Sequence, residues 1–218
     1  MGIKCFLVEP VAKIRIWARR YSKSVPNCCP KYPGEHSYHN AMNLIGDFDF
    51  PLVPHGEYEN WDTFVETLRP PAGDPLWPAK CECGATFENS DTIERGGQMF
   101  VHRLHKRSDN GELVTLRDAP AGAMWRAWWM QHEGRYWDWD NQTEAPLMCE
   151  TPNGGEWNID GRASNCTLPN DRLHRCWVRH GIPPLVTVDK NGLTCAAGAG
   201  SIISRGWHGF LRNGELVP

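Results

Sequence analysis

The sequence predicts an α+β protein with mostly short antiparallel strands and hairpins, one or two helices, and a zinc knuckle that stabilises the fold. Three observations predict this class. Short apolar runs are separated by turns rich in Asn, Asp and Gly, which is typical of hairpins. One segment carries three Trp residues at helical spacing. Two Cys residues stand one position apart and precede a Gly, as in metal-binding turns.

Strands are expected from the N-terminus onward. Residues 3–8 are an apolar run that Pro10 ends, and residues 11–17 alternate, with Ile14 and Ile16 on one face. Three hairpins are expected further along the chain, each around a turn that contains Gly. Their strand pairs are 98–107 with 112–117, 148–150 with 156–159, and 185–188 with 193–197.

Two helices are expected. The first covers residues 61–68, with Asn60 as its N-cap. The second covers residues 119–130 and follows Asp118, whose carboxylate can cap a helix. The residues of this second helix that fall on one face, which is expected to lie in the core, are Trp125, Trp128 and Trp129.

The chain divides into three segments that are expected to form one compact domain. Residues 1–70 hold the N-terminal strands and a loop rich in Cys and His, and residues 71–118 hold the Cys turn and a hairpin. Residues 119–218 hold the Trp-rich helix and a β-rich C-terminal part. The Pro-rich stretch 69–75 is the clearest internal linker.

Composition argues against several classes of protein. With 40% apolar and 22% charged residues, the chain is expected to be globular. A net charge of −3 gives no general attraction to nucleic acid or to an anionic membrane. No apolar run approaches the roughly 18 residues of a membrane span, and no secretory signal is visible. We therefore expect a reducing cytosol, where the nine Cys residues serve as metal ligands or buried thiols more often than as disulfides.

The turn that contains Cys81 and Cys83 is the strongest chemical signal in the sequence. Such a turn can aim two thiolates at one point, and zinc binds soft sulfur ligands in a tetrahedron. Zinc in a structural role is therefore the expected cofactor, and it needs two further ligands. We expect Cys28 or Cys29, together with His39, to supply them, because the preceding loop is rich in Pro and Gly and can turn these side chains inward.

Three other His residues are alternative ligands. His36 lies in the same loop, whereas His102 and His105 follow the Cys turn. In a strand, a spacing of three places these last two side chains on opposite faces, which argues against them as a pair. A further alternative is that the Cys residues remain unpaired thiols and bind no metal.

A second group of donors lies in the C-terminal third. Its members could bind zinc, form a disulfide, supply a Cys/His nucleophile pair, or be buried thiols, and the sequence leaves these alternatives open. The donors are Cys166, His174, Cys176, His180 and Cys195.

A weak catalytic signal surrounds Cys195, which stands among small residues with His208 nearby. A thiolate and a base are the parts of a nucleophilic centre, so Cys195 and His208 are the catalytic candidates. Small residues are equally typical of tightly packed strands. We favour the interpretation that these small residues serve the packing of strands, because no family-specific catalytic motif surrounds this Cys.

Residues 156–167, 174–181 and 187–202, together with 81–84 and 115–125, resemble uncharacterised proteins of tailed bacteriophages that infect actinobacteria. The resemblance covers most of the chain. It implies a viral origin and expression in the cytoplasm of the host, with incorporation into the virion as one outcome. It implies no activity and assigns no functional residues.

Three functions are compatible with these signals. The first is a non-enzymatic phage protein, virion-associated or host-interacting, whose partner is a protein. The second is a hydrolase-like enzyme with a Cys/His or metal-bound-water centre in the C-terminal half. The third is a zinc-dependent nucleic-acid binder, suggested by basic residues such as Arg15, Arg19 and Arg20. No membrane partner is expected.

Overall fold

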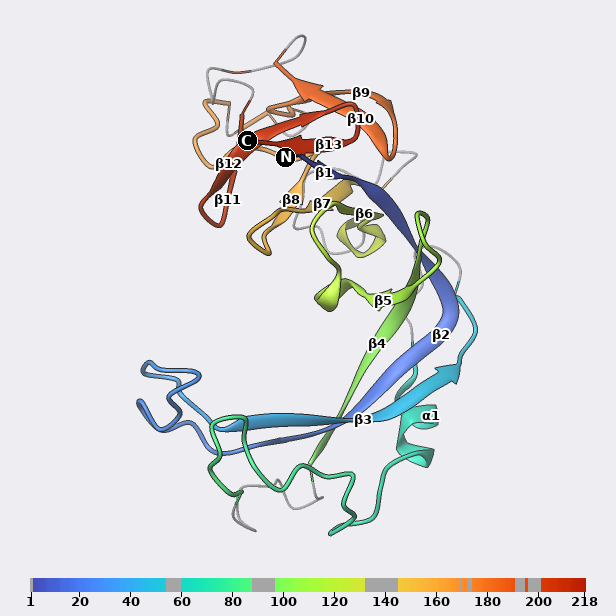
Figure 1. Cartoon of the computed structure of the whole chain (residues 1–218), viewed down its shortest axis with the longest axis vertical. Coiled ribbons are helices and arrows are strands. Elements are labelled where there is room, and N and C mark those ends of the chain that lie inside the picture. The colour runs from blue at the N-terminus through green and yellow to red at the C-terminus, as the bar shows by residue number, and fades with distance from the viewer. Residues whose placement is uncertain are drawn as a thin grey trace. The chain divides into compact units, whose positions relative to one another are not determined.

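The regular structure of the described residues is mostly β-strand. The computed structural model describes residues 2–53, 60–87, 97–131, 145–168, 170–171, 174–190, 195 and 201–218. Strands make up 43% of these residues and helices 7%, and the described residues form a single α-helix, α1 (Asp62–Thr67). The predicted α+β class is therefore wrong, because sheets dominate the fold (Figure 1).

The chain forms two compact units. The C-terminal unit contains the described residues of Met1–Val11 and His105–Pro218, and the middle unit contains those of Ala12–Val53 and Tyr58–Leu104. Two long strands, β2 (Phe6–Tyr21) and β4 (Gln98–Arg107), contribute residues to both units.

Apart from one strand of ten residues, the remaining elements have two to six residues each. They are β1 (Ile3–Lys4), β3 (Asn40–Asp49), β5 (Leu113–Thr115), the 3-10 helix η2 (Leu116–Asp118), β6 (Ala123–Arg126), the 3-10 helix η3 (Trp128–Gln131), β7 (Leu147–Glu150), β8 (Glu156–Asn158), β9 (Val178–Ile182), β10 (Leu185–Asp189), β11 (Ile202–Ser204), β12 (Trp207–Arg212) and β13 (Glu215–Val217). The largest sheet has the order β5–β4–β2–β6–β7–β8, and β3 also pairs with β2. A four-stranded sheet has the order β1–β13–β12–β11, which brings the two ends of the chain side by side (Figure 1).

Alternating strand residues form the core of the C-terminal unit. Val186 and Val188 of β10 are buried, and they pack in one cluster with Leu211 of β12 and Leu216 of β13. Apolar burial of this kind is the main stabilising term in a folded domain. The cluster also includes Ile159, which directly follows β8 and begins the segment that carries the C-terminal donors.

In the middle unit, β2, β3 and β4 carry an apolar face on which α1 packs. Ile14 and Ile16 of β2 are fully buried, as their alternation predicts, and they pack against Val65 of α1. The antiparallel pairing of β2 with β3 contains an irregularity between Ile16 and Trp17. At the Asn40 end of β3, the chain enters from the loop that carries the first group of candidate ligands.

The expected helix over residues 119–130 does not form. A turn ending at Gly122 leads into β6, which pairs in parallel with β2 and antiparallel with β7, so cross-strand hydrogen bonds take the place of helical ones. Gly122 has φ +90°, and a Cβ added there would lie 2.6 Å from the carbonyl oxygen of Lys4. Trp125 is buried and Trp129 is exposed, so the prediction of a shared core face is also wrong.

Two of the predicted hairpins are confirmed. The turn at 108–111 joins β4 to β5, and the turn at 153–155 joins β7 to β8. In the third case β10 pairs with β9, which precedes it in the chain. The strand expected at 193–197 lies outside the described residues except for Cys195.

Local signals at element ends were less accurate than the strand patterns. Pro10 lies inside β2 and does not end it. The predicted first helix is confirmed as α1, but its N-cap position is held by Trp61 rather than Asn60, without a side-chain hydrogen bond. Asp118 belongs to η2, where its backbone N–H donates to Thr115 Oγ1. Propensities set these positions only weakly, and the tertiary partners decide them.

Candidate metal centres

The turn with Cys81 and Cys83 is a tight hairpin. Lys80 and Thr86 form an isolated antiparallel bridge, and the N–H of Cys81 donates to the carbonyl oxygen of Ala85 at 2.8 Å. Gly84, with φ +92°, takes the left-handed position that this turn requires, and an added Cβ there would find open space. The hairpin holds the two Cys residues in a fixed backbone geometry.

The opposite half of the first centre comes from the loop between β2 and β3. Ser37 is buried and its Oγ accepts a hydrogen bond from the N–H of Cys29 at 2.9 Å. Ser22 Oγ accepts one from the N–H of His39, also at 2.9 Å. Because the loop has no helix or strand of its own, these side-chain bonds position its two donors.

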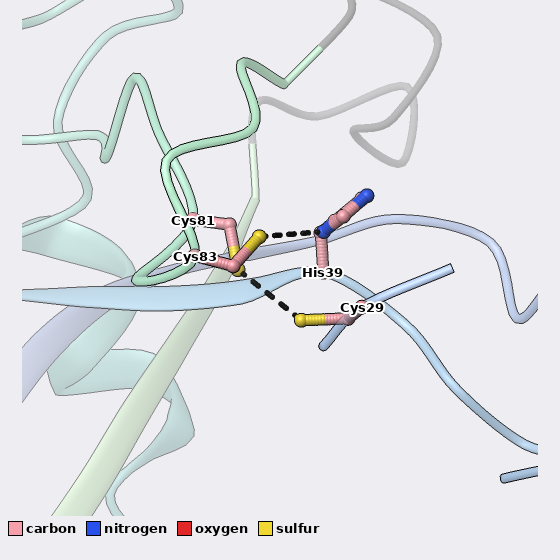
Figure 2. A group of neighbouring side chains, drawn as sticks. All are labelled: Cys29, His39, Cys81 and Cys83. Atoms are coloured by element: carbon pink, nitrogen blue, oxygen red, sulfur yellow. Dashed lines mark hydrogen bonds between the residues drawn. The ribbon is translucent and has the colours of Figure 1, made fainter. Parts of the chain in front are cut away.

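Cys29, His39, Cys81 and Cys83 form a group that we call site 1. Their four ligand atoms all lie within 4.8 Å of one another, so they could hold a metal ion. Figure 2 shows the side chains converging from the loop and from the hairpin, with the two Cys of the hairpin facing Cys29 and His39.

Two distances in site 1 match a tetrahedron. The sulfurs of Cys29 and Cys81 lie 3.8 Å apart, and Cys83 Sγ lies 3.3 Å from His39 Nδ1. A zinc ion with sulfur at about 2.3 Å and nitrogen at about 2.0 Å separates two sulfurs by about 3.8 Å, and sulfur from nitrogen by about 3.5 Å. These two separations therefore agree with a zinc ion between the ligand atoms.

Hydrogen bonds favour a thiolate at Cys81. Burial alone would raise the pKa of this thiol, but hydrogen bonds from the backbone of Cys83 and Asn40 and from the His39 side chain lower the pKa to about 7. The backbone N–H of Asn40 lies 3.3 Å from Cys81 Sγ. Burial raises the pKa of Cys29 above its ordinary value, so the two thiols differ before any metal binds.

The structure brings Cys81, Cys83 and His39 together, and of the two alternatives for the fourth ligand it places Cys29, not Cys28, in the group. The sulfur of Cys28 instead lies 3.6 Å from Ser37 Oγ. The alternative ligand His36 is exposed. The rings of His102 and Trp17 lie in edge contact, with centroids 5.8 Å apart, and neither His102 nor His105 belongs to the group.

A second group, which we call site 2, consists of Cys166, His174, Cys176 and Cys195. Its ligand atoms also lie within 4.8 Å of one another. Cys195 Sγ lies 3.6 Å from Cys176 Sγ and 3.8 Å from Cys166 Sγ, and His174 Nε2 lies 3.6 Å from Cys176 Sγ. All nine Cys residues are free thiols, so none of the disulfides considered from the sequence is formed.

The electrostatics of site 2 differ from those of site 1. Burial, together with the neighbouring thiols of Cys166 and Cys195, raises the pKa of Cys176 to about 12 against an opposing backbone hydrogen bond from Ala163. In the metal-free protein this sulfur is therefore a thiol at neutral pH. A reactive Cys nucleophile needs the opposite shift.

The other C-terminal candidates lie outside site 2. His180 Nε2 lies 3.1 Å from Asp189 Oδ1 across the β9–β10 hairpin. His208 is exposed on β12, where its ring lies beside that of Phe210. The described contacts of Cys195 include two other thiols, which is the geometry of a ligand set rather than of the proposed Cys195–His208 pair.

Comparisons with models of protein families, with curated proteins and with solved structures find no match to this chain. Within the described residues, no helix combines the length and the apolar character needed to cross a bilayer.

Proposed function

We propose that this chain is a non-catalytic protein whose fold is stabilised by zinc and which acts by binding another protein. The observation that carries the proposal is site 1, where a loop and a hairpin that are distant in sequence supply four buried or half-buried donors to one point. A metal there joins two segments whose shared buried cluster is small and itself contains two of the ligands, Cys29 and Cys81.

The donor set favours zinc. Three sulfurs and one imidazole nitrogen are soft to borderline ligands, which zinc binds in a tetrahedron, whereas calcium and magnesium require oxygen. The sulfur–sulfur distance of 3.8 Å agrees with that geometry. The lowered pKa of Cys81 supports thiolate ligation, because a metal must displace the proton of each Cys that it binds.

A site with four protein ligands supports a structural role. Catalytic zinc keeps one position for water or substrate, and it has three protein ligands. In site 1 all four tetrahedral positions have a protein donor. Zinc bound in this way stabilises the folded state and activates no water.

The surface of the C-terminal unit supports protein binding. Ile182 and Leu185, which face each other at the end of the β9–β10 hairpin, are 82% and 62% exposed. Two Pro residues, Pro183 and Pro184, lie between them. Two large apolar side chains exposed side by side at the end of a hairpin support a contact with another protein.

The basic residues of β2 support nucleic-acid binding less well than the exposed hairpin supports protein binding. Lys13 pairs with Asp49 at 2.6 Å, and Arg15 pairs with Asp47 at 2.7 Å. These carboxylates on β3 neutralise two of the cations that a phosphate backbone would need. The resemblance of the chain to phage proteins makes a virion or host protein the first partner to test.

The proposal is tested in two steps. X-ray absorption spectroscopy of the zinc-loaded Cys176→Ser variant, in which only site 1 keeps all its ligands, is expected to report sulfur and nitrogen neighbours without a water ligand; an oxygen ligand from solvent would contradict the structural role. A photo-crosslinking residue at position 182 is then expected to couple the chain to one protein in purified phage particles or in the infected host. The same crosslinker at Lys23, which is exposed in the middle unit, serves as the control.

A further inference from the structure

We propose that site 2 is a second zinc centre that binds its ion independently of site 1, so that each unit of the chain has its own metal. Cys166, His174 and Cys176 come from the segment between β8 and β9, and Cys195 follows β10. This proposal concerns other residues than the proposed function does, and each can fail without the other.

The distances in site 2 agree with one tetrahedron. The sulfur of Cys195 lies 3.6 and 3.8 Å from the other two sulfurs, and the sulfur of Cys176 lies 3.6 Å from the imidazole nitrogen of His174. Ideal zinc–ligand distances require about 3.8 Å and about 3.5 Å, respectively. Three edges of the ligand polyhedron thus have the lengths that a zinc ion imposes.

The backbone around Cys166 is arranged as in a metal-binding turn. The N–H of Leu168 points to Cys166 Sγ at 3.4 Å, and the N–H of Cys166 donates to the carbonyl oxygen of Ala163 at 3.1 Å. A backbone N–H that points to a sulfur can offset the negative charge of a metal-bound thiolate. In site 1 the N–H of Asn40 does the same for Cys81.

Cationic side chains next to site 2 fit the charge of the complex. Three thiolates, one neutral imidazole and Zn²⁺ carry a net charge of −1. Lys190 Nζ donates to the carbonyl oxygen of Cys176 at 3.0 Å, and Arg162 Nε donates to that of His174 at 3.4 Å. Both cations are therefore bonded to the backbone of ligand residues, where they offset that charge.

Two competing interpretations explain less of this geometry. A disulfide would need sulfurs about 2 Å apart and would leave the third thiol and the imidazole without a role. A Cys/His nucleophile would have to meet its substrate, but Cys176 is fully buried and His174 is only 6% exposed. A metal uses all four groups at once.

Zinc in site 2 has a structural consequence for the C-terminal unit. The described residues between β8 and β9 form no strand or helix, although Ile159 and Trp177 at the two ends of this segment pack in the core. Because this segment lacks the backbone hydrogen bonds of a strand or helix, its three bonds to zinc would hold it in place instead. The ion would thereby fix the entry into β9 and the hairpin that follows it.

The experiment measures zinc content and thiol protection on the full chain. Mass spectrometry of the zinc-loaded protein is expected to show two zinc ions per chain, one in the Cys176→Ser variant and two in the Cys28→Ser control. One zinc in the unsubstituted chain, retained by Cys176→Ser, would overturn the proposal.

A second measurement uses the unsubstituted chain, so it does not depend on how a variant folds. Cys166, Cys176 and Cys195 are expected to resist alkylation when zinc is bound and to become labelled after a chelator is added. Cys5, a half-buried thiol outside both sites, reports general unfolding. Equal labelling of Cys166 and Cys195 with and without zinc would reject site 2, whereas unprotected Cys81 and Cys83 would reject site 1 alone.

Discussion

Cys29 Sγ and Cys81 Sγ lie 3.8 Å apart, although 52 residues separate them in the sequence. Between them run β3, α1 and the Pro-rich stretch, so a metal bound at this point closes a long loop. Joining such distant positions restricts the unfolded chain, which is one reason why metal sites stabilise small or irregular folds. Site 1 is therefore the expected determinant of stability in the middle unit.

The neighbouring residues Cys28 and Cys29 offer a matched test of site 1. Cys29→Ser is expected to remove one zinc ion and to weaken zinc binding at site 1 by more than about 100-fold. Removal of a residue that only hydrogen-bonds to a metal ligand already lowers metal affinity by about 10- to 100-fold, and Cys29 is itself a ligand. Cys28→Ser is expected to keep both the metal and the stability, because its sulfur lies beside Ser37 and outside the ligand set. Competition with a coloured chelator measures both affinities. Equal affinities for the two variants would contradict the assignment of Cys29.

Ser37 positions a ligand without belonging to site 1. In the Ser37→Ala variant, the buried N–H of Cys29 loses its acceptor, which is expected to lower zinc affinity by about 10- to 100-fold. The unfolding free energy of the zinc-bound protein is expected to fall by about 1–3 kcal/mol. The control is Ser24→Ala, at an exposed position of the same loop. Chemical denaturation in the presence of zinc measures the difference, and a similar effect of both substitutions would refute this role of Ser37.

The pKa of Cys81 predicts a pH dependence of the metal-free protein. Its thiol has a pKa of about 7 in the folded state, against an ordinary value of 9.0. The thiolate therefore contributes stability that is complete above about pH 9, decreases as the pH falls, and is lost below about pH 7. The ultraviolet absorbance of the thiolate is expected to rise with a midpoint near pH 7. If the Cys81→Ser variant keeps this rise, the assignment to Cys81 is wrong.

Asp160 is a buried carboxylate that connects β7 with two arginines. Its Oδ2 accepts a hydrogen bond from the N–H of Leu147 at 2.9 Å, and its oxygens lie 3.5 Å from Arg175 Nη1 and 3.2 Å from Arg179 Nη1. Asp160→Asn is expected to lower the unfolding free energy by about 1–3 kcal/mol. The substitution removes the buried negative charge with which both arginines pair. The exposed pair of Lys13 and Asp49 supplies the control, Asp49→Asn, with an expected change below about 0.5 kcal/mol. Thermal unfolding monitored by circular dichroism compares the two variants.

Gly122 tests why residues 119–130 do not form a helix. Gly122→Ala is expected to destabilise the protein by about 1–3 kcal/mol, because Ala is strained at φ +90° and its Cβ would also approach the carbonyl oxygen of Lys4. Gly154→Ala isolates the strain, since that position has φ +72° but the atom nearest to an added Cβ, Glu150 Oε1, would lie 3.8 Å away. Urea denaturation is expected to rank Gly122→Ala as the more destabilising change. A neutral Gly122→Ala variant would show that the turn before β6 accepts a side chain.

Local patterns were sufficient where a single strand or turn decides the structure. The alternation of Ile14 with Ile16 predicts their shared buried face, and the turns at 108–111 and 153–155 predict two hairpins. The period of the side chains is a property of one strand, so it can be read from one segment. The spacing of Trp125, Trp128 and Trp129 was misleading, because a helical period says nothing about sheet partners.

At site 1, too, the sequence predicts the segments that supply the ligands, whereas the tertiary structure decides which side chains meet. The Cys turn and the Cys/His loop were recognisable from the sequence, but the choice between Cys28 and Cys29 was not, since adjacent side chains point in different directions and only the bonds of Ser37 orient them. In site 2 the four donors were all visible as candidates, yet their convergence depends on β8, β9 and β10 being placed by the core.

The sequence by itself determined which residue types can bind a metal, where the chain turns and which strand faces are apolar. The tertiary structure alone decided that β6 joins a sheet, that Cys29 faces Cys81, and that Cys195 meets Cys166 and Cys176. The physical reason is the distance along the sequence over which each interaction acts. Turn chemistry and alternation act over a few residues, whereas strand pairing and metal ligation depend on groups that only the folded chain brings within a few ångströms of one another.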